Sequence, residues 1–436
     1  MLPLAVAEQN AEWTVCKGRL CVEGGVCAGS LAEKFGTPLY VYNAGCIRSN
    51  YTALRKHFPH FVIAYSMKAN PALGICTLMH QLGARVEVAS GGEIGTALAA
   101  GFPSEAILFA GPAKEKWELT LACQREIGII NVESIRELEF LCKRSNSVTA
   151  LPQICVRVNS RGSPIDAVEK MVGGPSRFGI DEEELPALFR KFKNKVNIVG
   201  LHVYCGSQIL NAQTIVDNFS RALRTFAEAG AYFQRSLTTL VFGGGFGVRN
   251  QRAESSLDLA AAAEEMRILI ASASRAGSLP RNLVLESGRF LVANAGLFIT
   301  KIVDIKSSRG ELYILTDGGI NNFLRPAFMH ADHEICLIDK LDQPIEMTAH
   351  VGGPLCTPLD EFAGASQLPH AKIGDLVGIF NAGAYGFSMS MHHFLGHAAP
   401  AEVLVDKRNT LLLRARMPPT SLVPTPVRRG GNTNRH

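Results

Sequence analysis

Short apolar runs alternate with longer segments of helical periodicity between residue 61 and about residue 290. Apolar runs of about four to eight residues are typical of buried strands, and apolar residues spaced three and four apart are typical of helices that cover a sheet. The predicted strands are 61–68, 85–89, 107–110, 127–132, 154–159, 199–204, 239–242 and 283–286. The helix-compatible segments between them include 92–100, 115–125, 135–144 and 211–230.

This alternation predicts the fold class. Strands separated by helices favour parallel βα units over hairpins, and eight such units close naturally into a (β/α)8 TIM barrel. The barrel is expected to begin after Pro38 and to span residues 37–289. We therefore expect an α/β protein built around this barrel.

The pattern changes beyond residue 289. Alternating apolar and polar residues, interrupted by turns, predict strands at 297–305, 311–316, 376–380, 401–405 and 410–414. Such strands are typical of an antiparallel β domain, here spanning 290–416, and the strand-like residues 1–36 are expected to join it. Residues 417–436 are rich in Pro, Gly, Asn and Arg and have little to bury, so a disordered tail is expected.

Composition narrows the class of protein. The chain has 436 residues, 47% of them apolar, which is enough for two domains with a sizeable core. The net charge of +5 is spread without blocks of Lys or Arg, so neither nucleic acid nor a membrane surface is an expected partner. Eleven scattered cysteines without a CxxC pair favour reduced thiols, and therefore a cytoplasmic protein without a structural metal site. Neither a signal peptide nor a membrane-spanning stretch is recognised.

Lys68 is the first candidate for chemistry. It ends the first predicted barrel strand next to apolar residues, and no carboxylate lies near it in the sequence. A lysine in such a place loses hydration, which lowers its pKa and favours the neutral amine that forms a Schiff base with a carbonyl compound. The alternative is a surface lysine at the end of a strand. The residues predicted to lie around Lys68 decide between these two roles.

Other polar residues follow the predicted strands at the same edge. In a barrel of this kind the active site lies at the carboxyl ends of the strands, and the loops after strands seven and eight often hold phosphate. The residues in these positions are Lys68, Glu87, Ser90, Glu93, Arg157, His202, Ser207, Glu286, Ser287, Gly288 and Arg289. The glycine run 243–247 and Arg289 could supply backbone N–H groups and a guanidinium for a phosphate. Taken singly, a glycine run is also typical of a tight turn, a histidine of a core and a glutamate of a buried ion pair.

Together these residues describe a site for pyridoxal 5'-phosphate (PLP). The set contains a lysine that can form a Schiff base, a carboxylate for the pyridinium nitrogen, a flat imidazole and a phosphate cradle. A carboxylate beside the ring nitrogen keeps the ring cationic, so that the ring can accept the electron pair released when a bond to Cα breaks. PLP is therefore the expected cofactor.

Seven motifs occur in a fixed order along the chain, at residues 65–70, 88–93, 202–207, 243–247, 286–289, 353–356 and 383–385. Over about residues 30–415 the sequence resembles the fold-type III PLP decarboxylases, the family of diaminopimelate and ornithine decarboxylases. This resemblance implies a barrel of the alanine-racemase type and a carboxy-lyase activity on an L- or meso-amino acid. It also implies a homodimer with shared active sites.

The resemblance implies a role for each matching residue. Lys68 would carry PLP covalently, His202 would stack on its ring and Glu286 would hold the pyridinium nitrogen. Cys356 would return a proton to the substrate after CO2 departs, and in this family the cysteine reaches the site from the partner subunit. Phosphate and other cofactor contacts are implied for Glu87, Arg157, Ser207, Gly244, Gly245, Ser287, Gly288, Arg289 and Tyr385.

Substrate recognition departs from the family pattern. Diaminopimelate decarboxylases carry Glu, and ornithine decarboxylases Asp, directly after the catalytic cysteine to bind a distal ammonium, whereas this chain has Thr357. Met329 stands in place of a carboxylate-binding Tyr, although Arg325 keeps the arginine of the diaminopimelate type. Burying an unpaired ammonium costs several kcal/mol, so a dibasic substrate is disfavoured. The residues expected around the substrate are Arg289, Arg325, Met329, Thr357 and Tyr385.

Three segments, residues 353–360, 383–386 and 394–397, are most similar to the branch of the butirosin-pathway type, which decarboxylates aminoacyl groups tethered to a carrier protein. A thioester-linked substrate has no free distal ammonium, which accounts for Thr357. We therefore expect an acidic aminoacyl group, glutamyl-like or aspartyl-like, on an acyl carrier protein. The alternatives are free meso-diaminopimelate, then an ornithine-type substrate, a PLP racemase, and an inactive regulatory homologue.

Overall fold

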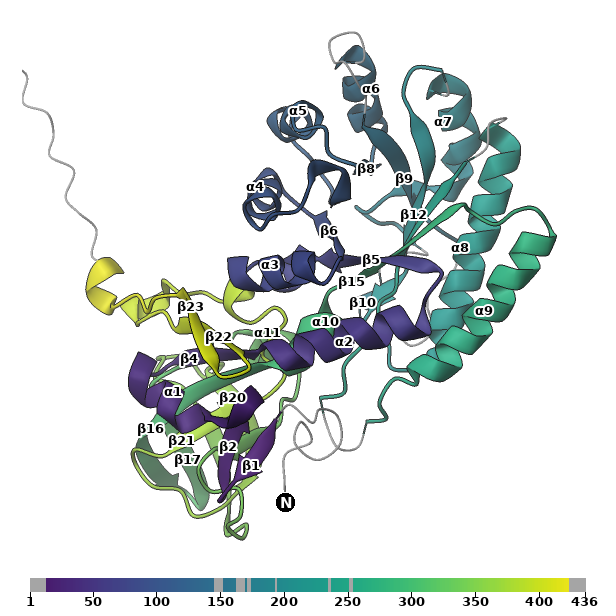
Figure 1. The fold of residues 1–436 in the computed structure, drawn as a ribbon. Coiled ribbons are helices and arrows are strands. Elements are labelled where there is room, and N and C mark those ends of the chain that lie inside the picture. The colour runs from purple at the N-terminus through teal and green to yellow at the C-terminus, as the bar shows by residue number, and fades with distance from the viewer. Residues whose placement is uncertain are drawn as a thin grey trace, which may run out of the picture.

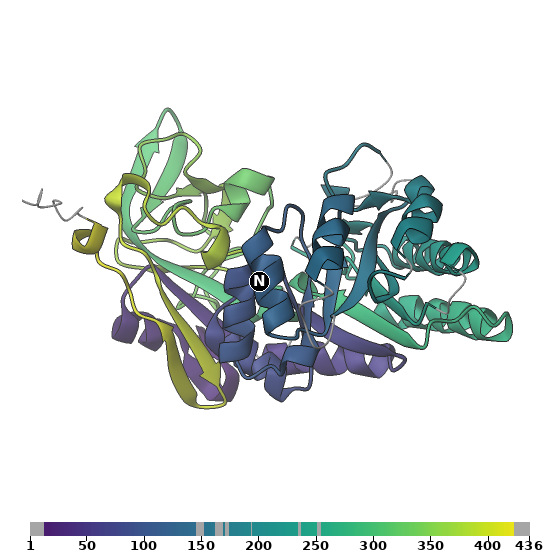
Figure 2. The same cartoon turned by 90° about the horizontal axis from the view of Figure 1, so that it is seen from above.

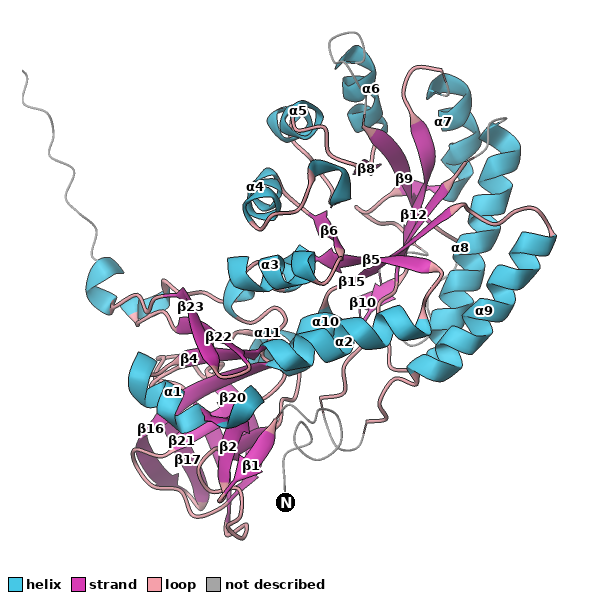
Figure 3. Ribbon diagram, viewed as in Figure 1, coloured by secondary structure: helices cyan, strands magenta, loops and turns pink. Residues whose placement is uncertain are grey.

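The computed structural model describes residues 13–144, 152–161, 169–170, 174–192, 194–233, 237–250 and 254–422. Two regions are visible in Figure 1, a barrel ringed by helices and a second region made mainly of strands. Figure 2 shows from above that the two regions lie side by side. Figure 3 shows that the long helices gather around the barrel.

Within the described residues, eight parallel strands form a closed barrel. β9 pairs with β8 on one side and β12 on the other, and β15 pairs with β5, so the sheet has no free edge at these positions. The strands are β5 (Phe61–Ser66), β6 (Arg85–Val88), β7 (Ile107–Phe109), β8 (Ile129–Val132), β9 (Gln153–Asn159), β12 (Ile198–Tyr204), β14 (Thr239–Gly243) and β15 (Asn282–Ser287). The prediction of a (β/α)8 barrel is confirmed. A short additional strand, β11 (Ile180–Asp181), also pairs with β9.

Side chains fill the interior of the barrel. A separate cluster of buried residues is formed by Ala64, Leu108, Ile129, Cys155, Val241 and Val284, one from each of six strands. Interiors of such barrels are packed cores and not pores, so polar groups gather where the strands end.

An apolar face explains why the helices pack on the barrel. α8 (Ala212–Phe233) buries Phe219 and Phe226 among other residues at helical spacing. The Phe219 ring lies 5.4 Å from the ring of Phe61 in β5 and 5.3 Å from that of Phe242 in β14. The other helices of this region are α2 (Ala44–His57), α3 (Leu73–Gln81), α4 (Gly91–Ala99), α5 (Lys116–Gln124), α6 (Ile135–Arg144), α7 (Leu185–Phe192) and α9 (Leu259–Arg275).

The second region is a β domain with mixed strand directions. Most neighbouring strands are antiparallel, as expected, but β17 with β19 and β22 with β4 run parallel. Neither pair is joined by a hairpin, because α11 (Arg325–Met329) lies between the first two strands and the whole barrel between the others. The strands are β4 (Leu39–Asn43), β16 (Gly296–Ser308), β17 (Glu311–Thr316), β18 (Ile335–Leu337), β19 (Met347–Gly352), β20 (Glu361–Leu368), β21 (Leu376–Ile379), β22 (Ala401–Asp406) and β23 (Asn409–Arg414).

The N-terminal strands form a small sheet of their own beside the β domain. They are β1 (Thr14–Cys16), β2 (Arg19–Val22) and β3 (Val26–Cys27), followed by α1 (Ala28–Phe35). Leu20 N donates to Ile338 O at 2.7 Å, and Leu341 N donates to Gly18 O at 2.8 Å. These strands therefore attach to the β domain without joining its main sheet.

The barrel was expected to span residues 37–289. β4 lies within the predicted barrel range but pairs with β16 and β22, so we propose that the barrel begins at α2. At the other end, α10 (Arg289–Val292) leads into β16.

Part of the predicted disordered tail is ordered in the structure. Met417 pairs with Ala399, and a 3-10 helix follows at Pro419–Leu422. Residues 423–436, like residues 1–12, lie outside the described residues.

None of the helices in the described parts of the chain has the length and apolar character needed to span a lipid bilayer.

Candidate active site

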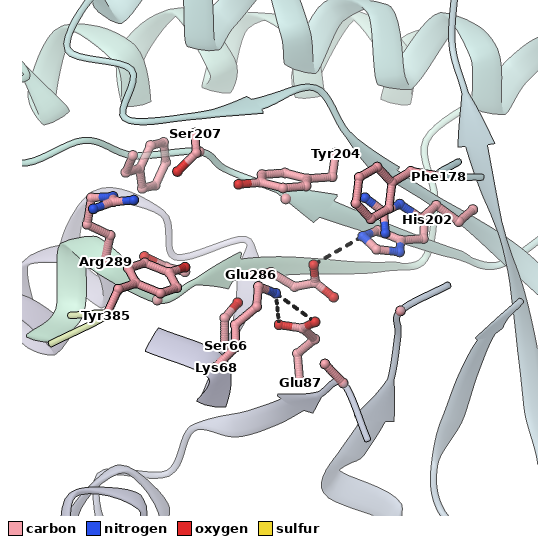
Figure 4. Close-up of a pocket in the computed structure, with 18 of the residues that line it drawn as sticks. Ser66, Lys68, Glu87, Phe178, His202, Tyr204, Ser207, Glu286, Arg289 and Tyr385 are labelled. Atoms are coloured by element: carbon pink, nitrogen blue, oxygen red, sulfur yellow. Dashed lines mark hydrogen bonds and ion pairs between the residues drawn. The ribbon is translucent and has the colours of Figure 1, made fainter. Parts of the chain in front are cut away.

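A cavity of about 220 Å³ opens at the carboxyl ends of the barrel strands (Figure 4). Residues that end or follow seven of the eight strands line it, together with one residue from the β domain. The predicted site residues among them are Lys68, Glu87, Arg157, His202, Ser207, Gly245, Glu286, Ser287, Gly288, Arg289 and Tyr385. Gly244 is not part of the lining, although Gly243 and Gly245 on either side of it are.

Lys68 is paired with a carboxylate, contrary to the expectation from the sequence. It lies in a 3-10 turn, Met67–Ala69, directly after β5, and its Nζ is 2.8 and 2.6 Å from the two carboxylate oxygens of Glu87. The strand register explains this contact, because Ser66 in β5 is the partner of Glu87 in β6. Burial alone would lower the pKa of the Lys68 amine, but the charges of Glu87, Tyr385 and Glu286 together outweigh burial and raise that pKa. The prediction of a lowered pKa is therefore wrong.

This ion pair has a chemical use. The amine of Lys68 must lose a proton before it can act as a nucleophile. Glu87 is buried in β6 and lies within hydrogen-bond distance, so its carboxylate is the acceptor nearest to that proton and holds the amine in place.

His202 and Glu286 form a second pair deep in the cavity. Nε2 of His202 in β12 lies 3.1 Å from Oε2 of Glu286 in β15. Burial would raise the pKa of the Glu286 carboxyl. His202 lowers this pKa most, Lys68 and Arg157 lower it further, and the result is a pKa below the usual value. Oε1 of Glu286 and Nδ1 of His202 are buried without a hydrogen-bond partner among the described residues. The carboxylate is therefore ionised and has one oxygen available to a ligand.

Donor groups gather at the other end of the cavity. Gly245 has a φ of +66°, and a Cβ at this position would lie 2.2 Å from the carbonyl oxygen of Gly206. Only glycine suits this backbone, which brings the loop after β14 close to Ser207. The hydroxyl of Ser287 and Nε of Arg289 are buried without a hydrogen-bond partner among the described residues. Hydroxyl, backbone and guanidinium donors together suit a phosphate.

Tyr385 brings the β domain into the site. Its backbone is in the left-handed region, with a φ of +55°, which costs a non-glycine residue roughly 1–2 kcal/mol. Its backbone N donates to Ala69 O at 2.7 Å, next to Lys68. Its ring lies 4.8 Å from the guanidinium carbon of Arg289. Tyr385 thus contacts both the lysine turn and the donor end of the cavity.

Several lining residues were not identified from the sequence. They include Ser66, Gly111, Phe178 and Tyr204. Tyr204 ends β12 two residues after His202, so its place at a strand end was a usable signal. Phe178 lies in the connection between β9 and β11, where no strand end or motif marks it.

Four predicted substrate or catalytic residues lie outside the cavity lining. Cys356 is exposed and Thr357 follows it, in the segment between β19 and β20. Asp360 anchors this segment, since its two carboxylate oxygens accept from Ile320 N and Leu355 N, each at 2.7 Å. The remaining two are Arg325, which is buried, and Met329, which is partly exposed; they begin and end α11.

The side chains present fit PLP. The ionised Glu286 matches a pyridinium N–H, His202 offers a flat ring surface, and the donors around Gly245 and Arg289 match a phosphate. Lys68 supplies the amine that would bind the cofactor aldehyde. Among the described residues there is no group of three or more His, Cys, Asp or Glu side chains that could hold a metal ion.

Comparison with known proteins agrees with this chemistry. Residues 44–293, more than half of the chain, match the family described as pyridoxal-dependent decarboxylase, pyridoxal binding domain. The chain belongs to this family. It is therefore a PLP-dependent carboxy-lyase, and the fold-type III resemblance seen in the sequence is confirmed.

Relatives within the decarboxylase family cover nearly the whole chain. The L-glutamyl-[BtrI acyl-carrier protein] decarboxylase of Niallia circulans is 31% identical over 414 residues, which cover 92% of this chain and 96% of that protein. The diaminopimelate decarboxylase of Aquifex aeolicus is 32% identical over 403 residues, covering 92% of this chain and 93% of the relative. A crystal structure of the diaminopimelate decarboxylase of Methanocaldococcus jannaschii has a TM-score of 0.89 at 29% identity and covers 95% of this chain and 97% of that chain.

Proposed function

We propose that this decarboxylase removes the α-carboxylate of an acidic aminoacyl group, glutamyl-like or aspartyl-like, held as a thioester on an acyl carrier protein. The observation that carries the proposal is Thr357. It occupies the position where relatives with dibasic substrates place an acid, and its Oγ1 accepts from Leu359 N at 3.3 Å. The side chain therefore carries no charge and serves a local turn, which leaves no partner there for a distal ammonium. A relative that acts on a glutamyl group on a carrier protein supports the same reading.

The cofactor would be held by residues along the whole cavity. Lys68 would bind PLP covalently and Glu87 would hold its amine in place, while Glu286 would face the ring nitrogen and His202 would lie against the ring face. Ser207, Gly245, Arg289 and Tyr385 would hold the phosphate, with support from Gly244, Ser287 and Gly288. When bound, PLP supplies the electron sink for the pair released as the Cα–carboxylate bond breaks.

The substrate side of the site would involve the β domain. Arg325 is 5% exposed; burial lowers the pKa of His333 to about 3, and the charges of Arg325 and Arg289 contribute in the same direction. We propose that Arg325, at the start of α11, binds the acidic side chain of the substrate, as a guanidinium binds a carboxylate. Met329, at the end of the same helix, contributes no hydrogen bond of the kind a tyrosine would make.

Cys356 would act from a second copy of the chain. The thiol is exposed and does not line the cavity of its own subunit. We propose a homodimer in which the partner's Cys356 completes each site and returns a proton to Cα. This arrangement makes each active site a product of two subunits.

Free meso-diaminopimelate is the second candidate substrate. Arg325 favours it, and most of the relatives found are diaminopimelate decarboxylases. Thr357 and Met329 weigh against it because they remove groups that would bind the distal ammonium and carboxylate.

Replacing Thr357 by an acid tests the choice between these substrates. Thr357→Glu is expected to raise kcat/KM for free meso-diaminopimelate at least about tenfold, because it restores a charge partner for the distal ammonium. Release of CO2 from free diaminopimelate and from a glutamyl-loaded carrier protein would be measured side by side. Thr357→Gln, similar in size but uncharged, is the matched control and should gain nothing. Efficient turnover of free diaminopimelate by the wild-type protein would refute the carrier-protein proposal.

Mixing two inactive variants tests the shared site. Lys68→Ala and Cys356→Ala subunits, once exchanged, should form hybrid dimers with one intact site each. Random pairing then restores about a quarter of the wild-type activity, since half the dimers are hybrids. The CO2 release rate is measured after subunit exchange has been demonstrated by mass spectrometry of tagged chains. No recovery would show that each site is built within one chain.

A further inference from the structure

A buried carboxylate behind the cavity joins three parts of its wall. Glu133, directly after β8, is 6% exposed and does not line the cavity. Its Oε1 accepts from Gly111 N and from Nη1 of Arg157, each at 2.8 Å. Its Oε2 accepts from Gly179 N at 3.2 Å. Gly111 and Arg157 line the cavity, and Gly179 directly follows the lining residue Phe178.

Glu133 is itself held firmly in place and ionised. Burial would raise the pKa of its carboxyl, but Arg157 and Lys114 lower it below its usual value. Lys114 is 2% exposed and forms an ion pair with Glu137 at 3.0 Å. The same oxygen of Glu137 accepts from the backbone N of Glu133 at 3.0 Å. A rigid, charged acceptor of this kind can fix the position of the groups bound to it.

Arg157 carries the effect of Glu133 into the site. Its guanidinium carbon lies 4.8 Å from the ring of Phe178 and 5.9 Å from that of Tyr204, both of which line the cavity. Its charge also helps to keep Glu286 ionised. Without Glu133 a buried guanidinium would lose its charge partner, and it would be expected to leave this position.

We propose that Glu133 is a positioning residue for the cofactor site, which sets the places of Arg157, of the Gly111 turn and of Phe178 without touching the cofactor. The geometry behind this proposal is the convergence of three donors on one buried carboxylate: one from the connection after β7, one from β9 itself and one from the connection after β9. Glu133 follows β8 at the same edge of the barrel as the lining residues, but its side chain lies behind the cavity wall.

The test compares the release of PLP from two variants. Glu133→Gln keeps the size of the side chain but replaces one accepting oxygen by an N–H2 group, which cannot satisfy the donor in front of it. PLP should dissociate at least about tenfold faster, the scale on which groups that orient a ligand act. The rate is followed as loss of the cofactor absorbance during dilution of the holoenzyme. Asp317→Asn is the matched control: Asp317 also accepts three hydrogen bonds, from Thr37, Thr300 and the backbone of Lys301, but none of these residues lines the cavity.

A second measurement separates positioning from general stability. If Glu133 acts through Arg157, the double variant Glu133→Gln/Arg157→Gln should release PLP no faster than Arg157→Gln alone. Should Glu133→Gln fail to fold, Glu133→Asp takes its place, because it keeps the charge but is too short to reach all three donors. A wild-type release rate in a folded Glu133 variant would overturn the proposal. So would a release rate that changes equally in Asp317→Asn, or additive effects in the double variant.

Discussion

Lys68→Ala is expected to abolish both cofactor binding through the lysine and decarboxylation. The wild-type protein should absorb at roughly 420 nm, as lysine-bound PLP does, and the variant should lack this band. Turnover should fall by at least about a thousandfold, because the covalent attachment that positions the cofactor is lost and no other amine can replace it from the same turn. The absorbance spectrum and the rate of CO2 release are the two measurements.

A lysine elsewhere provides the control for this variant. Lys340 in the β domain also forms an ion pair, with Asp375, but lies outside the cavity lining. Lys340→Ala should keep the absorbance band and the activity. A wild-type protein that stays colourless and cannot be reconstituted with PLP would contradict the assignment of Lys68.

Cys356→Ala should slow turnover by roughly a hundredfold or more while the cofactor stays bound. The loss is on the scale expected for a positioned proton donor. The absorbance band is retained because Cys356 does not line the cavity that would hold PLP in its own subunit. CO2 release and product identity are measured together, since a misplaced proton changes the product as well as the rate.

Another exposed cysteine controls for the loss of a thiol as such. Cys16, in the small N-terminal sheet, is exposed like Cys356. Cys16→Ala should leave rate and product unchanged. If Cys356→Ala behaved in the same way, another group would deliver the proton.

The barrel could be predicted because each of its parts is a local pattern. A buried parallel strand is a short apolar run, and its helix carries an apolar stripe, so β5 and α8 are each recognisable without knowledge of their neighbours. The relative directions of the strands in the β domain could not be predicted from local patterns. β4 pairs with β22 from the other end of the chain, and no local pattern records a contact at that distance.

The same distinction applies to the site. Lys68, His202, Glu286 and Arg289 stand at strand ends, where the geometry of a barrel brings side chains together. The charge of Lys68 was misjudged because its partner, Glu87, lies on the neighbouring strand and is set by the register of β5 against β6. Glu133 also follows a predicted strand, but nothing in the sequence shows that its partners are two backbone N–H groups and the guanidinium of Arg157.

The hydrogen bond from Tyr385 to Ala69 means that the two domains cannot be treated as separable parts. Asn70, next to the lysine turn, also donates from its side chain to Gly383 O at 3.0 Å. The turn that carries Lys68 thus rests on a segment of the β domain. Exchanging this domain for that of a relative, in order to change the substrate, would also replace the residues that hydrogen-bond to the turn of Lys68. A chimaera that keeps residues 383–385 with the barrel preserves that support.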